Sequence, residues 1–162
     1  MIAHPELPQT ARQDTDRTIE HETGDIIMVP MVDARLSAGT GSFETSGNAE
    51  RFYAFRLDFL IRKGIPAQMV LMRVAGDSME PEIKDGDVVL IDQSQMTPIP
   101  GKLYAVGVDE MVYIKEVNAM PGKLILSSHN KAYEALEVDA RGDLADGIRI
   151  IGRAVWVGRE LK

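Results

Sequence analysis

The chain has 162 residues, of which 44% are hydrophobic and 27% charged, enough for one globular domain with or without a tail. It contains no cysteine, which excludes a disulfide scaffold, a Cys-ligated zinc site and a cysteine nucleophile. Its net charge of −7 excludes a dominant basic surface for nucleic acid, and no apolar run approaches the roughly 18 residues of a membrane span.

The first 24 residues differ in composition from the rest of the chain. Met1–Gly24 is rich in Pro, Gln, Thr, Asp, Glu and His, with isolated apolar residues and no hydrophobic period. This composition predicts a flexible tail or linker before a domain that spans residues 25–162. The tail lacks the apolar core of a secretory signal, so we expect a cytoplasmic protein.

Two segments follow the tail. Asp25–Val32 turns apolar and contains Pro30, which predicts an edge strand, because proline cannot donate a hydrogen bond to a neighbouring strand. Leu36–Ser42 consists mainly of small residues, which is typical of a loop between ordered segments.

One short helix is predicted over Arg56–Lys63. Gly64 and Pro66, directly after it, are stop signals. Phe52 and Phe55 start this helix or belong to an extended entry, and the pattern leaves both open. The apolar residues that fall on one helical face are Leu57, Leu60 and Ile61.

After residue 66 the pattern changes to short apolar runs separated by Asp-Gly and Pro-Gly turns. This punctuation predicts a mainly β domain. The predicted strands are Met69–Val74, Val88–Ile91, Leu103–Val108, Met111–Val117, Leu124–Leu126 and Ile148–Val157.

Ser78 is the strongest candidate nucleophile. It lies in the sequence VAGDSMEP after a predicted strand, on a tight turn where backbone N–H groups lie close by. Such a turn can present a hydroxyl and hold an oxyanion on the N–H groups of Asp77 and Ser78. A polar turn serine is the alternative, and Glu80 in place of the second glycine excludes the G-x-S-x-G elbow of α/β hydrolases.

Three histidines are available to a Ser-His-Asp triad. His4 and His21 lie in the predicted tail, and we expect His129 to be a loop residue.

We also expect no metal and no cofactor. The acidic residues near the Asp-Gly-Asp turn lack the spacing of an EF-hand and are expected to have turn and solvent roles; they are Asp85, Asp87 and Asp92.

Lys115 is a better candidate base than a histidine. In the predicted strand, alternation puts it in one row with apolar Met111, Tyr113 and Val117. Desolvation in such a row would lower the pKa of the amine, and a neutral amine can accept a serine proton. The alternative is a structural lysine paired with a nearby carboxylate such as Glu116.

Taken together, these motifs resemble the LexA and phage-repressor family of Ser–Lys self-cleaving proteins. The resemblance covers about residues 25–162. It rests on Gly76–Pro81 with the Asp85–Asp87 turn, Lys115 placed 37 positions after Ser78, an Ala38-Gly39 pair before the serine, Ser127–Tyr133 after the lysine strand, and Ile150–Trp156 as a closing strand.

The resemblance implies a LexA-like and signal-peptidase-like fold of several coiled β-sheets with one short helix. It implies self-cleavage at Ala38-Gly39, within a loop of about residues 36–42, by Ser78 with Lys115 as base. It also implies a homodimer, control by a DNA-damage signal through a RecA–single-stranded DNA filament, and a phage-type repressor. Operator DNA would be bound only through a helix-turn-helix domain, of which this chain shows no pattern.

Two other functions stay open. A UmuD-like accessory protein of translesion DNA synthesis carries the same Ser–Lys pair behind a short N-terminal arm, and a β domain with an inert pair would serve only oligomerisation. A membrane signal peptidase shares the Ser–Lys chemistry but needs an anchor that this sequence does not show.

Overall fold

The computed structural model describes residues 17–38, 41–44, 51–139 and 147–162. Within these ranges the chain is mainly β, as the sequence predicts, with one α-helix and one short 3-10 turn. In chain order the elements are β1 (Thr18–Ile19), β2 (Ile26–Val32), β3 (Phe52–Arg56), α2 (Leu57–Lys63), η1 (Pro66–Gln68), β4 (Met69–Arg73), β5 (Val88–Asp92), β6 (Lys102–Val108), β7 (Met111–Met120), β8 (Lys123–Ser127), β9 (Leu136–Asp139) and β10 (Ile148–Gly158).

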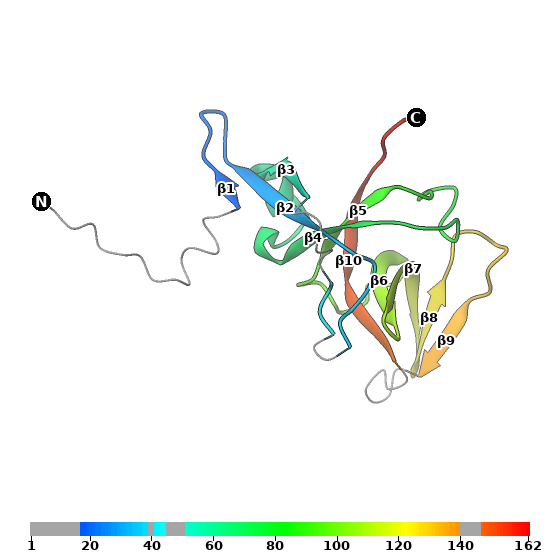
Figure 1. Ribbon diagram of the computed structural model, residues 1–162. Coiled ribbons are helices and arrows are strands. Elements are labelled where there is room, and N and C mark those ends of the chain that lie inside the picture. The colour runs from blue at the N-terminus through cyan, green and yellow to red at the C-terminus, as the bar shows by residue number, and fades with distance from the viewer. Residues whose placement is uncertain (1–16, 39–40, 45–50, 140–146) are drawn as a thin grey trace, which may run out of the picture.

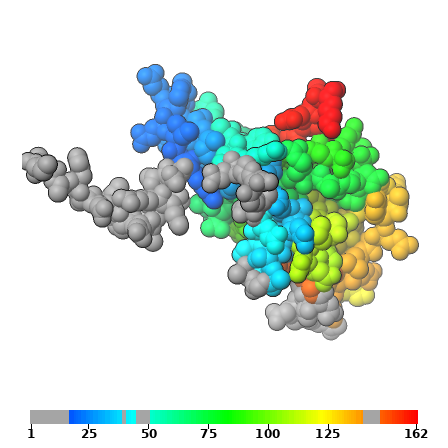
Figure 2. Space-filling model, viewed as in Figure 1, coloured from blue at the N-terminus to red at the C-terminus, as the bar shows by residue number. Residues whose placement is uncertain are grey.

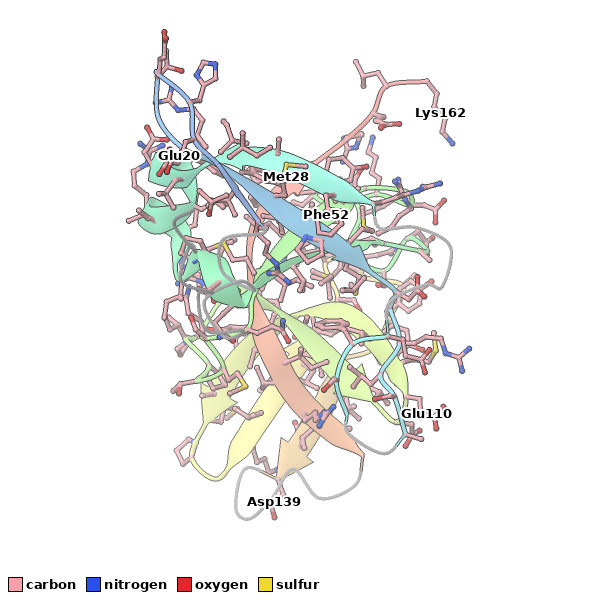
Figure 3. The ribbon with its side chains drawn as sticks, turned by 60° about the vertical axis from the view of Figure 1, so that its left-hand side comes forward. Glu20, Met28, Phe52, Glu110, Asp139 and Lys162 are labelled. Atoms are coloured by element: carbon pink, nitrogen blue, oxygen red, sulfur yellow. The ribbon has the colours of Figure 1, made fainter. Side chains whose placement is uncertain are left out.

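The strands form one continuous hydrogen-bonded series in the order β1-β2-β4-β5-β10-β6-β7-β8-β9, with β3 added on β2 (Figure 1). All neighbours are antiparallel except β2 and β4. In Figure 3, Met28 and Phe52 mark the β2–β3 end, whereas Glu110 and Asp139 lie at the opposite end. The long strand β10 joins these two halves because it pairs with β5 on one side and with β6 on the other.

Two irregularities let β10 serve both halves. Its register shifts between Ile150 and Gly152 against β6, and between Ala154 and Trp156 against β5. Such bulges bend a strand and increase its twist. Gly152 is required at this bend, since a Cβ atom there would lie 2.6 Å from the carbonyl oxygen of Asp92.

The apolar core consists of three clusters. One lies between α2 and strands β2 to β5, and another between β6, β7, β8 and β10. The middle cluster joins segments that are far apart in sequence: Leu36, Met79 and Ile83, and Val112 and Ile114 of β7. Packing of this middle cluster therefore holds the turn after Ser78, the segment around Leu36 and β7 together.

The structure settles the entry to the helix. Phe52 and Phe55 belong to strand β3, and the helix begins at Leu57. Leu60 is fully buried and Leu57 half-buried, but Ile61 is exposed, so the apolar face predicted from Leu57, Leu60 and Ile61 is buried only in part. The helix has only seven residues and packs through its i, i+3 pair.

The prediction of an edge strand over Asp25–Val32 is also wrong. Strand β2 is internal: β3 pairs with it on one side, and β1 and β4 on the other. Pro30 is tolerated because it lies between the residues that pair with β1, Ile26–Ile27, and those that pair with β4, Met31–Val32.

The predicted tail contains one short strand. Thr18–Ile19 pairs with β2, and residues 1–16 lie outside the described residues. The apolar pattern gave no sign of this strand because it is held by backbone hydrogen bonds and its apolar residue, Ile19, is exposed.

Candidate functional site

Ser78 lies on the long turn between β4 and β5. Backbone hydrogen bonds close this turn at its base, from Val74 N–H to the Asp87 carbonyl at 2.8 Å and from Gly86 N–H to the Val74 carbonyl at 2.8 Å. Gly76, with a φ of 86°, allows the sharp change of direction before the serine, and its N–H donates to the Asp85 carboxylate at 2.7 Å. The Gly-Asp-Ser motif and the Asp-Gly-Asp motif thus form the two arms of one turn.

Buried side chains anchor this turn on both sides of Ser78. Met79 and Ile83 are buried in the middle core cluster. Asp87 is 1% exposed and receives two hydrogen bonds of 2.6 Å from the Arg159 guanidinium, which lower the pKa of its carboxyl group. Ser78 itself is half-buried.

The backbone around Ser78 offers free donors. Within the described ranges, the N–H groups of Asp77 and Ser78 donate no hydrogen bond. Neighbouring N–H groups of the same turn are used, such as that of Glu80, which donates to the Asp77 carbonyl at 3.1 Å. Two adjacent unused N–H groups are what an oxyanion hole requires.

Lys115 lies in the middle of β7 with its amine partly withdrawn from water. Burial lowers the pKa of this amine. Its Nζ donates to the Ser128 hydroxyl at 2.6 Å and lies 6.0 Å from the centre of the Tyr133 ring. No hydrogen bond joins Lys115 to Ser78 in the part of the chain that the structure describes.

The predicted apolar row around Lys115 is only half correct. Met111 and Tyr113 are exposed, while Val117 is fully buried. The sheet twists, so this face of β7 is covered only beyond Lys115. The lysine therefore lies at the boundary between water and core.

One turn, residues 127–133, contacts both the serine turn and the lysine strand. The Asn130 N–H donates to the Ser78 carbonyl at 3.0 Å, and the Asn130 side chain donates to the Asp77 carbonyl at 3.1 Å. The Tyr133 hydroxyl donates to the Asp77 carboxylate at 2.5 Å, a hydrogen bond that raises the pKa of Tyr133. Since Ser128 of the same turn binds Lys115, this turn connects the backbone at Ser78 with the amine of Lys115.

The motif Ser127–Tyr133 could be recognised in the sequence, but its residues could not be given roles there. Ser128, Asn130 and Tyr133 each bind a part of the candidate site. Polar residues in a loop are common, and only the fold shows which ones reach across to another segment.

Ala38 lies far from Lys115. Its segment pairs antiparallel with the start of β7, where Arg35 lies opposite Met111 and the Leu36 N–H donates to the Glu110 carbonyl at 2.8 Å. Figure 2 shows this cyan segment beside the yellow-green atoms of β7. Met111 is already four residues, or roughly 13 Å at about 3.3 Å per residue, before Lys115 along β7, and the antiparallel course of the segment takes Ala38 further away.

Three further contacts hold the segment in this register. Leu36 is 3% exposed in the middle core cluster, and the Ser37 N–H donates to the Ser42 carbonyl at 2.9 Å. The Arg149 guanidinium of β10 donates to the Gly41 carbonyl. Ala38 is exposed at the end of this hairpin, and Gly39 lies outside the described residues.

The remaining candidates have other partners. His129 contacts Glu82 and Glu116 rather than Ser78, so it forms no triad with this serine. Asp87 and Asp92 are buried rather than solvated: Asp92 accepts hydrogen bonds from Ser94 and Gln95, among others. The described residues contain no group of three or more His, Cys, Asp or Glu side chains placed to hold a metal ion. Nor do they include a helix of the length and apolarity that a membrane span needs.

Comparison with known proteins agrees with the resemblance seen in the motifs. The chain is 39% identical over 83 residues to the repressor protein CI of Enterobacteria phage phi80, covering 51% of this chain and 33% of that protein. It is 31% identical over 141 residues to an uncharacterized HTH-type transcriptional regulator of Haemophilus influenzae, covering 82% of this chain and 58% of that protein. It is 27% identical over 146 residues to the HTH-type transcriptional regulator PrtR of Pseudomonas aeruginosa, covering 88% of this chain and 56% of that protein.

These three proteins are all longer than the aligned region, which spans from a third to less than two thirds of their length. The model of one protein family, Peptidase S24-like, matches residues 30–155, which include both Ser78 and Lys115. This match covers well over half of the chain and confirms the predicted kinship with LexA and the phage repressors. The chain belongs to the Peptidase S24-like family.

Proposed function

We propose that this chain is the self-cleaving C-terminal part of a phage-type repressor and that Ser78 and Lys115 cut the Ala38-Gly39 bond. The observation that carries the proposal is the partly desolvated amine of Lys115, clustered with the serine turn through residues 127–133. Lysine prefers to be charged and solvated, so an amine withdrawn from water beside a nucleophile is typical of a base.

In the proposed reaction the neutral Lys115 amine accepts the proton of the Ser78 hydroxyl. Oγ forms a bond to the carbonyl carbon of Ala38, and the N–H groups of Asp77 and Ser78 hold the oxyanion. The ammonium of Lys115 then returns its proton to the Gly39 nitrogen as the C–N bond breaks. Water hydrolyses the resulting Ala38 ester and restores the serine.

Before this reaction Lys115 must exchange its hydrogen bond to Ser128 for one to Ser78. Ser128 belongs to the turn that also binds the Ser78 carbonyl through the Asn130 N–H, so the exchange takes place where the two segments already meet. Hydrogen bonds of a catalytic pair are often made only once the substrate is in place.

The segment that carries Ala38 must also leave its hairpin and move toward Lys115. Cleavage within one chain has a high effective concentration once the segment is docked, so the fraction of docked molecules sets the rate. The observed register favours the undocked state, which supports a slow basal reaction that a signal can accelerate.

The test is the mass of the chain after incubation at pH values from 7 to 10. We expect two products, residues 1–38 and 39–162, whose first-order rate of appearance rises with pH as Lys115 loses its proton. Ser78→Ala and Lys115→Met should abolish both products, whereas Lys102→Met, which removes an exposed lysine from β6, should not change the rate. An intact mass at every pH would refute self-cleavage and leave an oligomerisation module.

The relatives named repressors and HTH-type regulators support the repressor context over a UmuD-like accessory protein. We therefore propose a homodimer whose cleavage separates it from a DNA-binding helix-turn-helix domain, with a RecA–single-stranded DNA filament as the signal that favours docking. Light scattering of the chain measures the dimer, and addition of the filament to the cleavage assay measures the acceleration. A filament without effect would leave an antirepressor-type signal as the alternative.

A further inference from the structure

His129 is a largely buried side chain placed between two carboxylates. Its side chain is 16% exposed, with Nε2 at 2.8 Å from Glu116 Oε2 and Nδ1 at 2.9 Å from Glu82 Oε2. These carboxylates come from two different segments, since Glu116 follows Lys115 on β7 and Glu82 lies four residues after Ser78. One side chain thus spans the lysine strand and the serine turn.

The two contacts differ in kind. The contact with Glu116 is a hydrogen bond, whereas Nδ1 has no aligned acceptor although it lies 2.9 Å from Glu82 Oε2. Glu116 is fixed further by the Asn118 amide at 2.9 Å, and these hydrogen bonds lower the pKa of Glu116.

The neighbours of His129 in the chain are the residues that touch the candidate dyad. Ser128 accepts the hydrogen bond of Lys115, and the Asn130 N–H donates to the Ser78 carbonyl. A shift of His129 would move both contacts, because residues 128 to 130 are consecutive.

We propose that His129 is a positioning residue, which holds the 127–133 turn against the serine turn and the lysine strand and so keeps water away from the Lys115 amine. This inference rests on the proposed self-cleavage by Ser78 and Lys115. His129 itself touches neither reacting group. Its effect on the reaction passes through Ser128 and Asn130.

The charges around Lys115 give the direction of the effect. The 127–133 turn contributes the Tyr133 ring, the serine turn contributes Asp77 through the Tyr133 hydroxyl, and the His129 contacts bring in Glu82 and Glu116. Removal of His129 leaves both glutamates without this partner and loosens the turn that covers the amine. More water around the amine favours the ammonium form of Lys115.

The test is the pH profile of self-cleavage in His129→Ala and His129→Gln, with His21→Ala as control because His21 is exposed on the β1–β2 turn. In His129→Ala the rise of the cleavage rate with pH should move to higher pH by about half a unit or more. The cleavage rate should then be roughly threefold lower than that of the unchanged chain at neutral pH, and this difference should disappear as the pH rises. Glutamine can still donate to one carboxylate, so His129→Gln should lie between the two. His21→Ala should match the unchanged chain.

A purely structural role would lower the rate by the same factor at every pH, and that result, or an unchanged profile, would overturn the inference. If His129→Ala does not fold, His129→Gln carries the test alone. A direct measurement does not need cleavage. The Lys115 amine is titrated by NMR of carbon-13-labelled lysine in the Ser78→Ala chain, and the titration is repeated in the Ser78→Ala chain that also carries His129→Ala. There the Lys115 amine should titrate at higher pH without His129, and equal titration curves would refute the inference. Failure of the unchanged chain to cleave would refute the proposed function only.

Discussion

Leu36 is the residue whose replacement should reveal whether the hairpin register controls cleavage. Its side chain is 3% exposed and packs in the middle core cluster, next to the strand that carries Lys115. For Ala38 to come opposite Lys115, the antiparallel register of its segment must shift by about seven residues, which takes Leu36 out of this pocket. Leu36→Ala therefore removes a contact that stabilises mainly the undocked state.

The size of the effect follows from the buried volume. Replacing a buried leucine by alanine costs about 2–5 kcal/mol, and the low end applies here because a hairpin at the edge of the core can relax. A loss of about 2 kcal/mol in the undocked state alone raises the docked fraction, and hence the cleavage rate, by roughly 30-fold.

The assay is the first-order rate of appearance of residues 39–162 by mass spectrometry at one fixed pH. Because Leu36 is close to the scissile bond, its replacement can also alter the docked state. Arg149→Ala provides an independent check, since Arg149 binds the Gly41 carbonyl from β10 and is not part of the moving segment. Loss of this one hydrogen bond, worth about 1 kcal/mol in the undocked state, should accelerate cleavage roughly fivefold. Unchanged or slower cleavage in both variants would refute the role of this register.

Two further predictions concern stability, both measured by thermal unfolding of the Ser78→Ala chain so that cleavage does not interfere. Arg159→Ala should lower the Tm by several degrees, because it leaves the buried Asp87 carboxylate without its cation. The folded pKa of Asp87 is depressed, so the stability that this ion pair contributes is present above the ordinary carboxyl pKa and is lost as the pH falls through the folded pKa. The Tm values of the chains with and without Arg159 should therefore converge in acid. Equal Tm values at neutral pH would contradict the ion pair. Lys115→Met should raise the Tm at neutral pH, because the lowered pKa of Lys115 means that folding disfavours its ammonium form. This cost to the free energy of unfolding disappears as the pH rises through the folded pKa of Lys115 toward its unfolded pKa. A lower Tm at neutral pH would show that the contacts of the lysine outweigh its desolvation.

Local chemistry made part of the site predictable. Gly76 and Ser78 are recognisable because a tight turn after a strand needs glycine and can present a hydroxyl. Lys115 stands out because a lysine among apolar strand residues is unusual. The expected direction of its pKa agrees with the structure, although the burial comes from only part of its row.

Contacts between distant segments were not predictable in the same way. The hydrogen bond of Lys115 to Ser128 and that of Asn130 to the Ser78 carbonyl depend on how β7 and β8 bring one turn over another. The contacts of His129 with Glu82 and Glu116 depend on the same placement, and no local pattern pairs His129 with Glu82.

By itself the sequence determined a mainly β fold, its family and the residue types that a serine–lysine reaction needs, because turns, alternation and motif spacing are local properties of the chain. Only the tertiary structure decided that β2 is internal and that Ala38 is held far from Lys115. It also decided that the Lys115 amine is withdrawn from water although only part of its strand row is buried. These depend on strand register and on the packing of a shared core, which join residues that no local pattern connects.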